Sequence, residues 1–169
     1  VRHNSYLFKG TVEENLRMAK PDATKEEMEA VLQKVNLLGF LQTQNGLQTE
    51  LLEKAGNLSG GQCQRLVIAR ALLRSDSAVY IFDEAASNID VESEELIMNV
   101  IHELAKTKTV LLISHRLANV VQSDQIYFLK NGTICERGTH AELMEQNGAY
   151  RHLYDSQMVL ENYGKEGNA

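Results

Sequence analysis

Two short apolar runs, each followed by polar residues of chemical interest, constrain the fold more than any other feature of this sequence. Residues 78–82 lead directly into Asp83 and Glu84, and residues 109–113 lead into His115 after one serine. Apolar runs of this length without alternation are typical of strands buried in a parallel sheet. We therefore expect two parallel strands that end in polar side chains, where open α/β sheets bind ligands.

The segments around these strands complete an α/β pattern. Residues 97–104 carry four apolar side chains on one helical face, which predicts a helix between the strands and hence a β-α-β unit. The pair Asn131-Gly132 tolerates the positive φ angles of a tight turn and predicts a hairpin between residues 125–130 and 133–137.

Residues before the first apolar run are expected to be mainly helical. Thr24 and Glu27 have the spacing of a capping box, in which each side chain bonds the other residue's backbone N–H, and Thr139 and Glu142 repeat that spacing near the C-terminus. The polar tail is expected to fray from Glu161 onward. The predicted domains are residues 1–75, a helical part; residues 76–157, an α/β part; and residues 158–169, a polar tail.

Composition excludes several classes of function. The net charge is −6 with a sequence pI of about 5.4, and no basic cluster occurs, so nucleic acid is not an expected partner. Cys63 and Cys135 lack the spacing of a zinc site and are expected to be free thiols. No apolar stretch approaches the roughly 20 residues of a membrane helix, so we expect a soluble chain without direct membrane insertion.

The segment Leu58-Ser59-Gly60-Gly61-Gln62 predicts an anion-binding site. Its glycines would let a phosphate approach the backbone, and the apolar helix that follows would direct its N-terminal N–H groups at the same point. The alternative is purely structural, because Ser59 and Gln62 also fit a capping box.

The acids and the histidine after the two apolar runs suggest phosphoryl transfer. Asp83 would hold Mg²⁺ through water, Glu84 would polarise the water that attacks a γ-phosphate, and His115 would hydrogen-bond that phosphate. Each of the three also has a structural alternative as an ordinary strand end.

In this order and spacing, the motifs resemble the nucleotide-binding domain of ABC transporters. Residues 58–62 match the signature motif and residues 79–84 match Walker B with its catalytic glutamate. Residues 87–90 look like the D-loop, with Asp90 at its acidic position, and His115 matches the H-loop. The resemblance implies a P-loop NTPase (RecA-like) core of class α/β, an α-helical subdomain that ends in the signature helix, and ATP and Mg²⁺ as cofactors.

Flanking segments resemble the exporter branch of that family. Residues 6–16 look like the segment after the Q-loop, Thr49 and Glu53 look like the exporter X-loop, and residues 132–150 resemble the exporter C-terminal stretch. The resemblance implies a second nucleotide-binding domain in a head-to-tail dimer, coupling helices of a transmembrane domain in a groove near residues 6–11 and 49–53, and a place on the cytoplasmic side of a membrane. In such a dimer the signature residues Ser59, Gly60, Gly61 and Gln62 serve the partner's ATP.

Two departures from the family pattern matter. No G-x-x-x-x-G-K-[ST] motif occurs in the 169 residues, so we expect a C-terminal fragment without Walker A that does not hydrolyse ATP on its own. The position of the Q-loop glutamine holds His3, which lacks the amide oxygen but could contact metal or water. Alternatives are a soluble ABC ATPase of DNA repair or translation and a degenerate, non-catalytic partner domain of a heterodimeric transporter.

Overall fold

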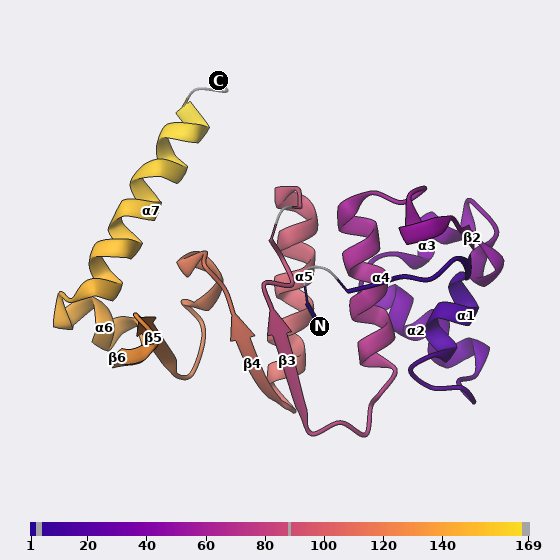
Figure 1. Ribbon diagram of the computed structural model, residues 1–169, viewed down its shortest axis with the longest axis horizontal. Helices are drawn as coiled ribbons and strands as arrows, with labels where there is room; N and C mark the ends of the chain where they lie inside the picture. The colour runs from indigo at the N-terminus through magenta and orange to yellow at the C-terminus, as the bar shows by residue number, and fades with distance from the viewer. Residues whose placement is uncertain (3–4, 88, 167–169) are drawn as a thin grey trace. The chain divides into compact units, whose positions relative to one another are not determined.

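The computed structural model describes residues 1–2, 5–87 and 89–166, and contacts divide it into two units, Val1–Ile113 and Ser114–Ala169. Figure 1 traces both units, and each is described here on its own. The first unit contains both the N-terminal helical segment, through residue 75, and the β-α-β segment that follows it. This division falls at the end of a strand, whereas the sequence suggested boundaries near residues 75 and 157, which stay predictions.

The N-terminal part of the first unit is built from short helices. They are α1 (Val12–Arg17), α2 (Lys25–Lys34), α3 (Leu38–Gln42), the 3-10 turns η1 (Gly46–Gln48) and η2 (Glu53–Ala55), and the long α4 (Gly60–Leu72). Two short strands, β1 (Gly10–Thr11) and β2 (Glu50–Leu51), pair antiparallel. This pairing brings segments about 40 residues apart in sequence side by side.

Capping boxes start four of the helices, as the spacing predicted for two of them. At α2, Thr24 Oγ1 accepts from the Glu27 N–H at 3.2 Å, and Glu27 Oε2 accepts from the Thr24 N–H at 3.0 Å. The same reciprocal bonds begin α1, α4 and α6. The predictions at residues 24–27 and 139–142 are therefore confirmed.

The β-α-β unit is confirmed with small shifts of its boundaries. β3 (Val79–Asp83) pairs parallel with β4 (Thr109–Ile113), and α5 (Val91–Ala105) connects them. On the other edge of β3, the Asp83 N–H donates to the Val1 carbonyl at 2.8 Å. Arg2 thus forms an isolated parallel bridge with Asp83 beside β3.

Only one face of this small sheet is buried. Tyr80 and Phe82 of β3 join the core with Ile97 and Ile101 of α5. The opposite face is about half exposed, at Val79, Ile81, Leu111 and Ile113. The expectation of strands buried on both faces is wrong for the described residues, because no described segment of this unit covers that face.

The second unit contains a hairpin and two helices. η3 (Leu117–Val120) precedes β5 (Ile126–Lys130) and β6 (Thr133–Gly138), which pair antiparallel. The turn that connects them consists of Asn131 and Gly132, whose φ angles are 51° and 78°. These positive φ angles confirm the predicted tight turn. α6 (His140–Gln146) follows, and Tyr150, at the start of α7, is fully buried.

α7 (Ala149–Glu166) continues past Glu161 to Glu166, and the expected fraying of the tail stays a prediction. Among the described residues, no helix has both the length and the apolar character needed to cross a bilayer.

Candidate functional site

The start of α4 combines the cap and the open glycine that an anion site needs. Ser59 Oγ accepts from the Gln62 N–H at 3.2 Å, and Gln62 Oε1 accepts from the Ser59 N–H at 2.9 Å. The Cys63 N–H donates to the Ser59 carbonyl at 2.9 Å. Because the first N–H groups of a helix have no intrahelical acceptor, those of Gly60 and Gly61 stay available for an anion. The capping box, which is the structural alternative, is thus present at Ser59 and Gln62, and it does not use the N–H groups of Gly60 and Gly61.

The two glycines of this segment have different surroundings. A Cβ on Gly60 would meet only Ile89, at 4.0 Å, and Gly60 is exposed. Gly61 is buried, and a Cβ there would overlap the side chain of Ser93, lying 2.7 Å from its Cβ. Gly60 therefore offers open backbone at the surface, whereas Gly61 allows α4 and α5 to approach closely at their N-terminal ends.

Asp83 and Glu84 occupy the C-terminal end of β3. Asp83 is partly buried, and its Oδ2 lies 3.7 Å from Arg2 Nε, a contact that the sequence motifs did not indicate. Glu84 is exposed and has a φ of 50°, in the left-handed region that residues other than glycine rarely adopt. Its N–H donates to the Ile113 carbonyl at 2.9 Å. Backbone strain of this kind concentrates at functional sites.

The segment between β3 and α5 hydrogen-bonds the backbone of Glu84 through Ser87 and begins α5 through Asp90. The Ser87 hydroxyl and N–H donate to the Glu84 carbonyl at 2.8 and 3.1 Å, and Ser87 is buried. Asp90 caps α5, with Oδ1 accepting from the Ser93 N–H at 2.8 Å. The backbone and hydroxyl hydrogen bonds from Ser93 lower the pKa of Asp90. Ser87 belongs to the segment that the sequence singled out, whereas Ser93 is a supporting residue that the sequence patterns did not indicate.

His115 lies in the second unit and is exposed there. Its carbonyl accepts from Gln157 Nε2 at 2.7 Å, and Gln157 Oε1 accepts from the Leu117 N–H at 2.9 Å. The loop that carries His115 is therefore held by α7 of the same unit. The structure brings Ser59, Gly61 and Asp90 close together, and Asp83 and Glu84 are neighbours at the end of β3. His3 and Asn88 lie outside the described residues.

The residues present fit a magnesium ion that is held mainly by other ligands. Asp83 supplies a partly exposed carboxylate, and Mg²⁺ is commonly bound by one or two carboxylates together with waters and substrate phosphates. Over the described residues, no group of three or more His, Cys, Asp or Glu side chains gathers into a metal cage. A nucleotide would have to supply much of the coordination.

An open groove lies beside α1 and α4, away from these polar groups. Its volume is about 400 Å³, and Phe8, Met18, Val67 and Arg70 contribute to its lining. The Phe8 ring contacts the Tyr6 ring edge to face at 4.8 Å between centroids, and Arg70 Nη2 donates to the Tyr6 carbonyl at 2.9 Å. Tyr6, Phe8 and Met18 are about half exposed, so the groove presents apolar surface flanked by an arginine.

Comparisons with known proteins agree on one family. A family model described as "ABC transporter" matches residues 1–87. An "Uncharacterized ABC transporter ATP-binding protein" of Haemophilus influenzae is 52% identical over 169 residues, 100% of this chain and 30% of the relative. An "ATP-dependent lipid A-core flippase" of Vibrio vulnificus is 44% identical over 156 residues, 91% of this chain and 27% of the relative.

A solved structure gives the same result for the fold. The structure of a bacterial Atm1-family ABC exporter with ATP bound matches with a TM-score of 0.83 and 30% sequence identity. The match covers 92% of this chain and 28% of that chain. This chain therefore spans less than a third of the length of the relatives that it matches.

Proposed function

Because this chain belongs to the ABC transporter family of ATP-binding proteins, we propose that it forms part of the ATPase domain that powers an exporter. The observation that carries the proposal is the exposed N-terminus of α4, where Ser59 and Gly60 lie at the surface and the backbone of Gly60 is open. An anion site on the surface is suited to a phosphate that another domain presents. Ser59, Gly60, Gly61 and Gln62 would thus contact the ATP of a partner domain.

The residues at the end of β3 would serve this domain's own ATP. Asp83 would hold Mg²⁺, which would neutralise phosphate charge, and Glu84 would orient and deprotonate the attacking water. His115 would hydrogen-bond the γ-phosphate. His3 would contact metal or water. Asp90, whose pKa is lowered by hydrogen bonds from Ser93, would remain ionised at the interface with the partner.

The partners follow from the same assignment. A second nucleotide-binding domain would dock head to tail, so that each ATP lies between one domain's P-loop and the other's signature. A groove near residues 6–11 and 49–53 would receive a coupling helix of a transmembrane domain, on the cytoplasmic side of a membrane. Phe8, which lines the groove beside α1 and α4, belongs to the first of these two segments. Residues 1–75 would form the helical subdomain, residues 76–157 the last part of the RecA-like core, and residues 158–169 a polar tail.

The 169 residues alone would not hydrolyse ATP. They contain no P-loop motif, and phosphoryl transfer depends mainly on positioning and on stabilisation of charge. The test is a chimera in which a P-loop-bearing segment of an ABC domain precedes Val1. We expect the chimera to hydrolyse Mg-ATP and the 169-residue chain not to. Glu84→Gln in the chimera should lower kcat by about 10²- to 10⁴-fold, the usual contribution of a positioned base.

Mixing two inactive chimeras tests the head-to-tail dimer. Ser59→Arg would block the signature that serves the partner, and Glu84→Gln would disable a domain's own site. A mixed dimer then contains one site with an intact Glu84 and an intact Ser59, so hydrolysis should reappear on mixing. If the mixture stays as inactive as its components, the two residues act within one domain and the proposed dimer is wrong.

The alternative proposal is a non-catalytic partner domain, and it is favoured by the histidine, His3, at the position of the Q-loop glutamine. The chimera separates the two proposals, because a degenerate domain would remain inactive with a P-loop in place. Restoring glutamine by His3→Gln would then raise activity if the histidine is the cause. The presence of both Glu84 and His115 favours the catalytic proposal.

A further inference from the structure

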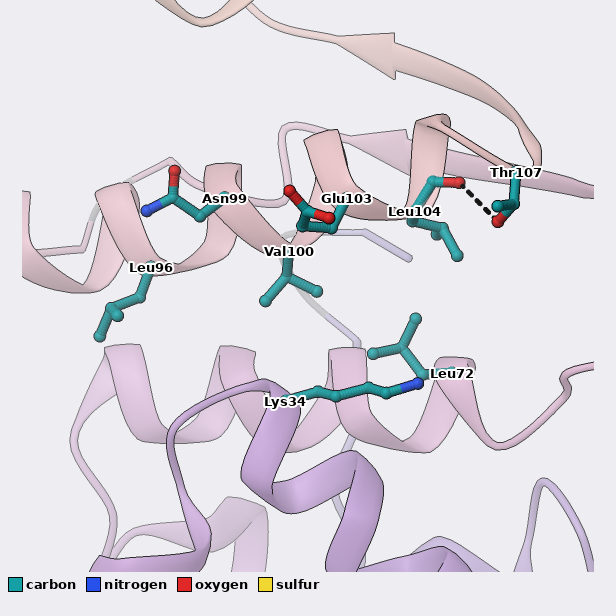
Figure 2. Close-up of a pocket in the computed structure, with 8 residues that line it drawn as sticks. All are labelled: Lys34, Leu72, Leu96, Asn99, Val100, Glu103, Leu104 and Thr107. Atoms are coloured by element: carbon teal, nitrogen blue, oxygen red, sulfur yellow. Dashed lines mark hydrogen bonds between the residues drawn. The ribbon is translucent and has the colours of Figure 1, made fainter.

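Helices α4 and α5 touch at their N-terminal ends and separate toward their C-terminal ends. At the N-terminal ends, Gly61 packs directly against Ser93. Farther along, beside Leu72 at the end of α4, the space between the helices opens into a cavity of about 520 Å³ (Figure 2). Known small-molecule pockets have volumes of about 300–1,000 Å³. The separation of the two helices is therefore large enough for a ligand.

Apolar side chains from both helices form the body of this cavity. They are Leu72 of α4 and Leu96, Val100 and Leu104 of α5. All four are only partly buried, unlike Ile101 on the adjoining face of α5, which is 2% exposed. Their remaining exposed area would be removed from water by an apolar ligand, which is a favourable change.

The charges at the cavity are unequal. Glu103 is paired with Lys106 through its Oε1, so its charge is locally compensated. Lys34, the last residue of α2, has no ion pair or hydrogen bond from its ammonium group to another described residue. Figure 2 shows the Lys34 side chain extending along the cavity to Leu72. A cation that pairs with none of the described residues thus lies next to apolar surface.

We propose that the cavity between α4 and α5 binds a small anionic amphiphile. The apolar chain of the ligand lies against Leu72, Leu96, Val100 and Leu104, and its carboxylate lies at Lys34. Apolar area supplies affinity, and the charge of Lys34 selects a carboxylate over a neutral or cationic head group. None of these residues belongs to the proposed ATP sites, so the ligand site and the ATPase function can each fail without the other.

The first test is a titration of the ¹⁵N-labelled 169-residue chain with decanoate below its micelle concentration, followed by NMR. Saturable shifts should centre on residues 34, 72 and 96–104. Octanoate, which is two methylenes shorter, should bind roughly 15-fold more weakly, because each buried methylene contributes about a fourfold change in affinity. Decyltrimethylammonium, with the same chain and opposite charge, should bind more weakly than decanoate. Shifts centred on the exposed strand face, or equal binding of the cation, would overturn the proposal.

Paired variants separate the apolar and the charged contributions. Lys34→Gln should weaken decanoate binding about threefold, as expected for one exposed ion pair, whereas Lys25→Gln on the same helix should not change it. Val100→Phe places a larger side chain in the cavity and should abolish saturable binding. Circular dichroism and thermal unfolding check that each variant is folded. Unchanged binding in both Lys34→Gln and Val100→Phe would show that the ligand binds elsewhere.

Discussion

At the scale of single residues, adjacent glycines of the signature segment have separate roles. Gly60 is exposed and has space around it, so in the proposed function its lack of a side chain would matter to an incoming phosphate. Gly61 is buried against Ser93, so its lack of a side chain matters to the packing of α4 on α5. A sequence motif assigns both glycines the same purpose, and only their neighbours distinguish them.

This difference predicts opposite outcomes for two alanine substitutions. Gly61→Ala forces a Cβ into the Ser93 side chain and should lower the free energy of unfolding by about 1–3 kcal/mol, the usual effect of overpacking. Gly60→Ala adds a Cβ into open space and should leave the fold as stable as before or slightly more stable. Urea unfolding followed by circular dichroism measures both. Equal destabilisation by the two substitutions would contradict the packing role of Gly61.

Glu84 has a backbone conformation that suits glycine better than glutamate. Its φ of 50° is expected to cost about 1–3 kcal/mol. Glu84→Gly should therefore be more stable than Glu84→Ala by about 1 kcal/mol, the reverse of the usual order inside helices and strands. Both variants lose the carboxylate, so their difference reports the backbone alone. If Glu84→Ala is the more stable of the two in urea unfolding, the residue is not strained.

At the scale of secondary structure elements, the caps connect helix stability to pH. The hydrogen bond from the Thr139 N–H holds the pKa of Glu142 below its ordinary value, and the bond from Lys20 does the same for Glu27. A carboxylate whose pKa is lowered by folding stabilises the folded state above its unfolded pKa and loses that contribution as pH falls through the folded pKa. Stability should thus be level near neutral pH and decline below about pH 4.5.

Glu142→Gln isolates one of these carboxylates, because glutamine also completes a capping box but does not titrate. The variant should resemble the parent chain at pH 7 and lose less stability between neutral and acid pH. Urea midpoints measured at several pH values check this. A parallel decline for both chains would mean that Glu142 does not contribute to acid sensitivity.

The elements that could be predicted from sequence are those with local causes. The caps at Thr24, Ser59 and Thr139, the turn at Asn131-Gly132 and the two parallel strands all follow from residues close together in the chain. β1 pairs with β2, and Val1 pairs with β3, although these segments lie far apart in sequence. No periodic pattern in the sequence predicts these pairings. The contact of Asp83 with Arg2 could not be predicted for the same reason.

At the scale of the whole molecule, the half-exposed face of β3 and β4 is an apolar surface that no described residue of its unit covers. Val79, Ile81, Leu111 and Ile113 share it, and β4 pairs only with β3 within the described residues. Exposed apolar faces and free strand edges favour association between chains.

We therefore predict that the 169-residue chain self-associates with rising concentration. Leu111→Lys places a charge in the centre of the exposed face and should shift the chain toward monomer in sedimentation velocity. Val91→Lys, at a residue of α5 that is 67% exposed, adds the same charge elsewhere and should leave association unchanged. A single monomeric species at high concentration in the parent chain would contradict this prediction.

In the proposed function, this chain contributes catalytic and signature residues to an ABC ATPase site whose phosphate cradle lies in another segment. Calorimetric titration with Mg-ATP, performed on the 169-residue chain and on the chimera that carries a P-loop before Val1, tests this proposal. We predict binding by the chimera and no saturable binding by the chain alone. Tight, specific Mg-ATP binding by the 169 residues would contradict the account, because phosphate recognition would then reside at the start of α4 without any P-loop.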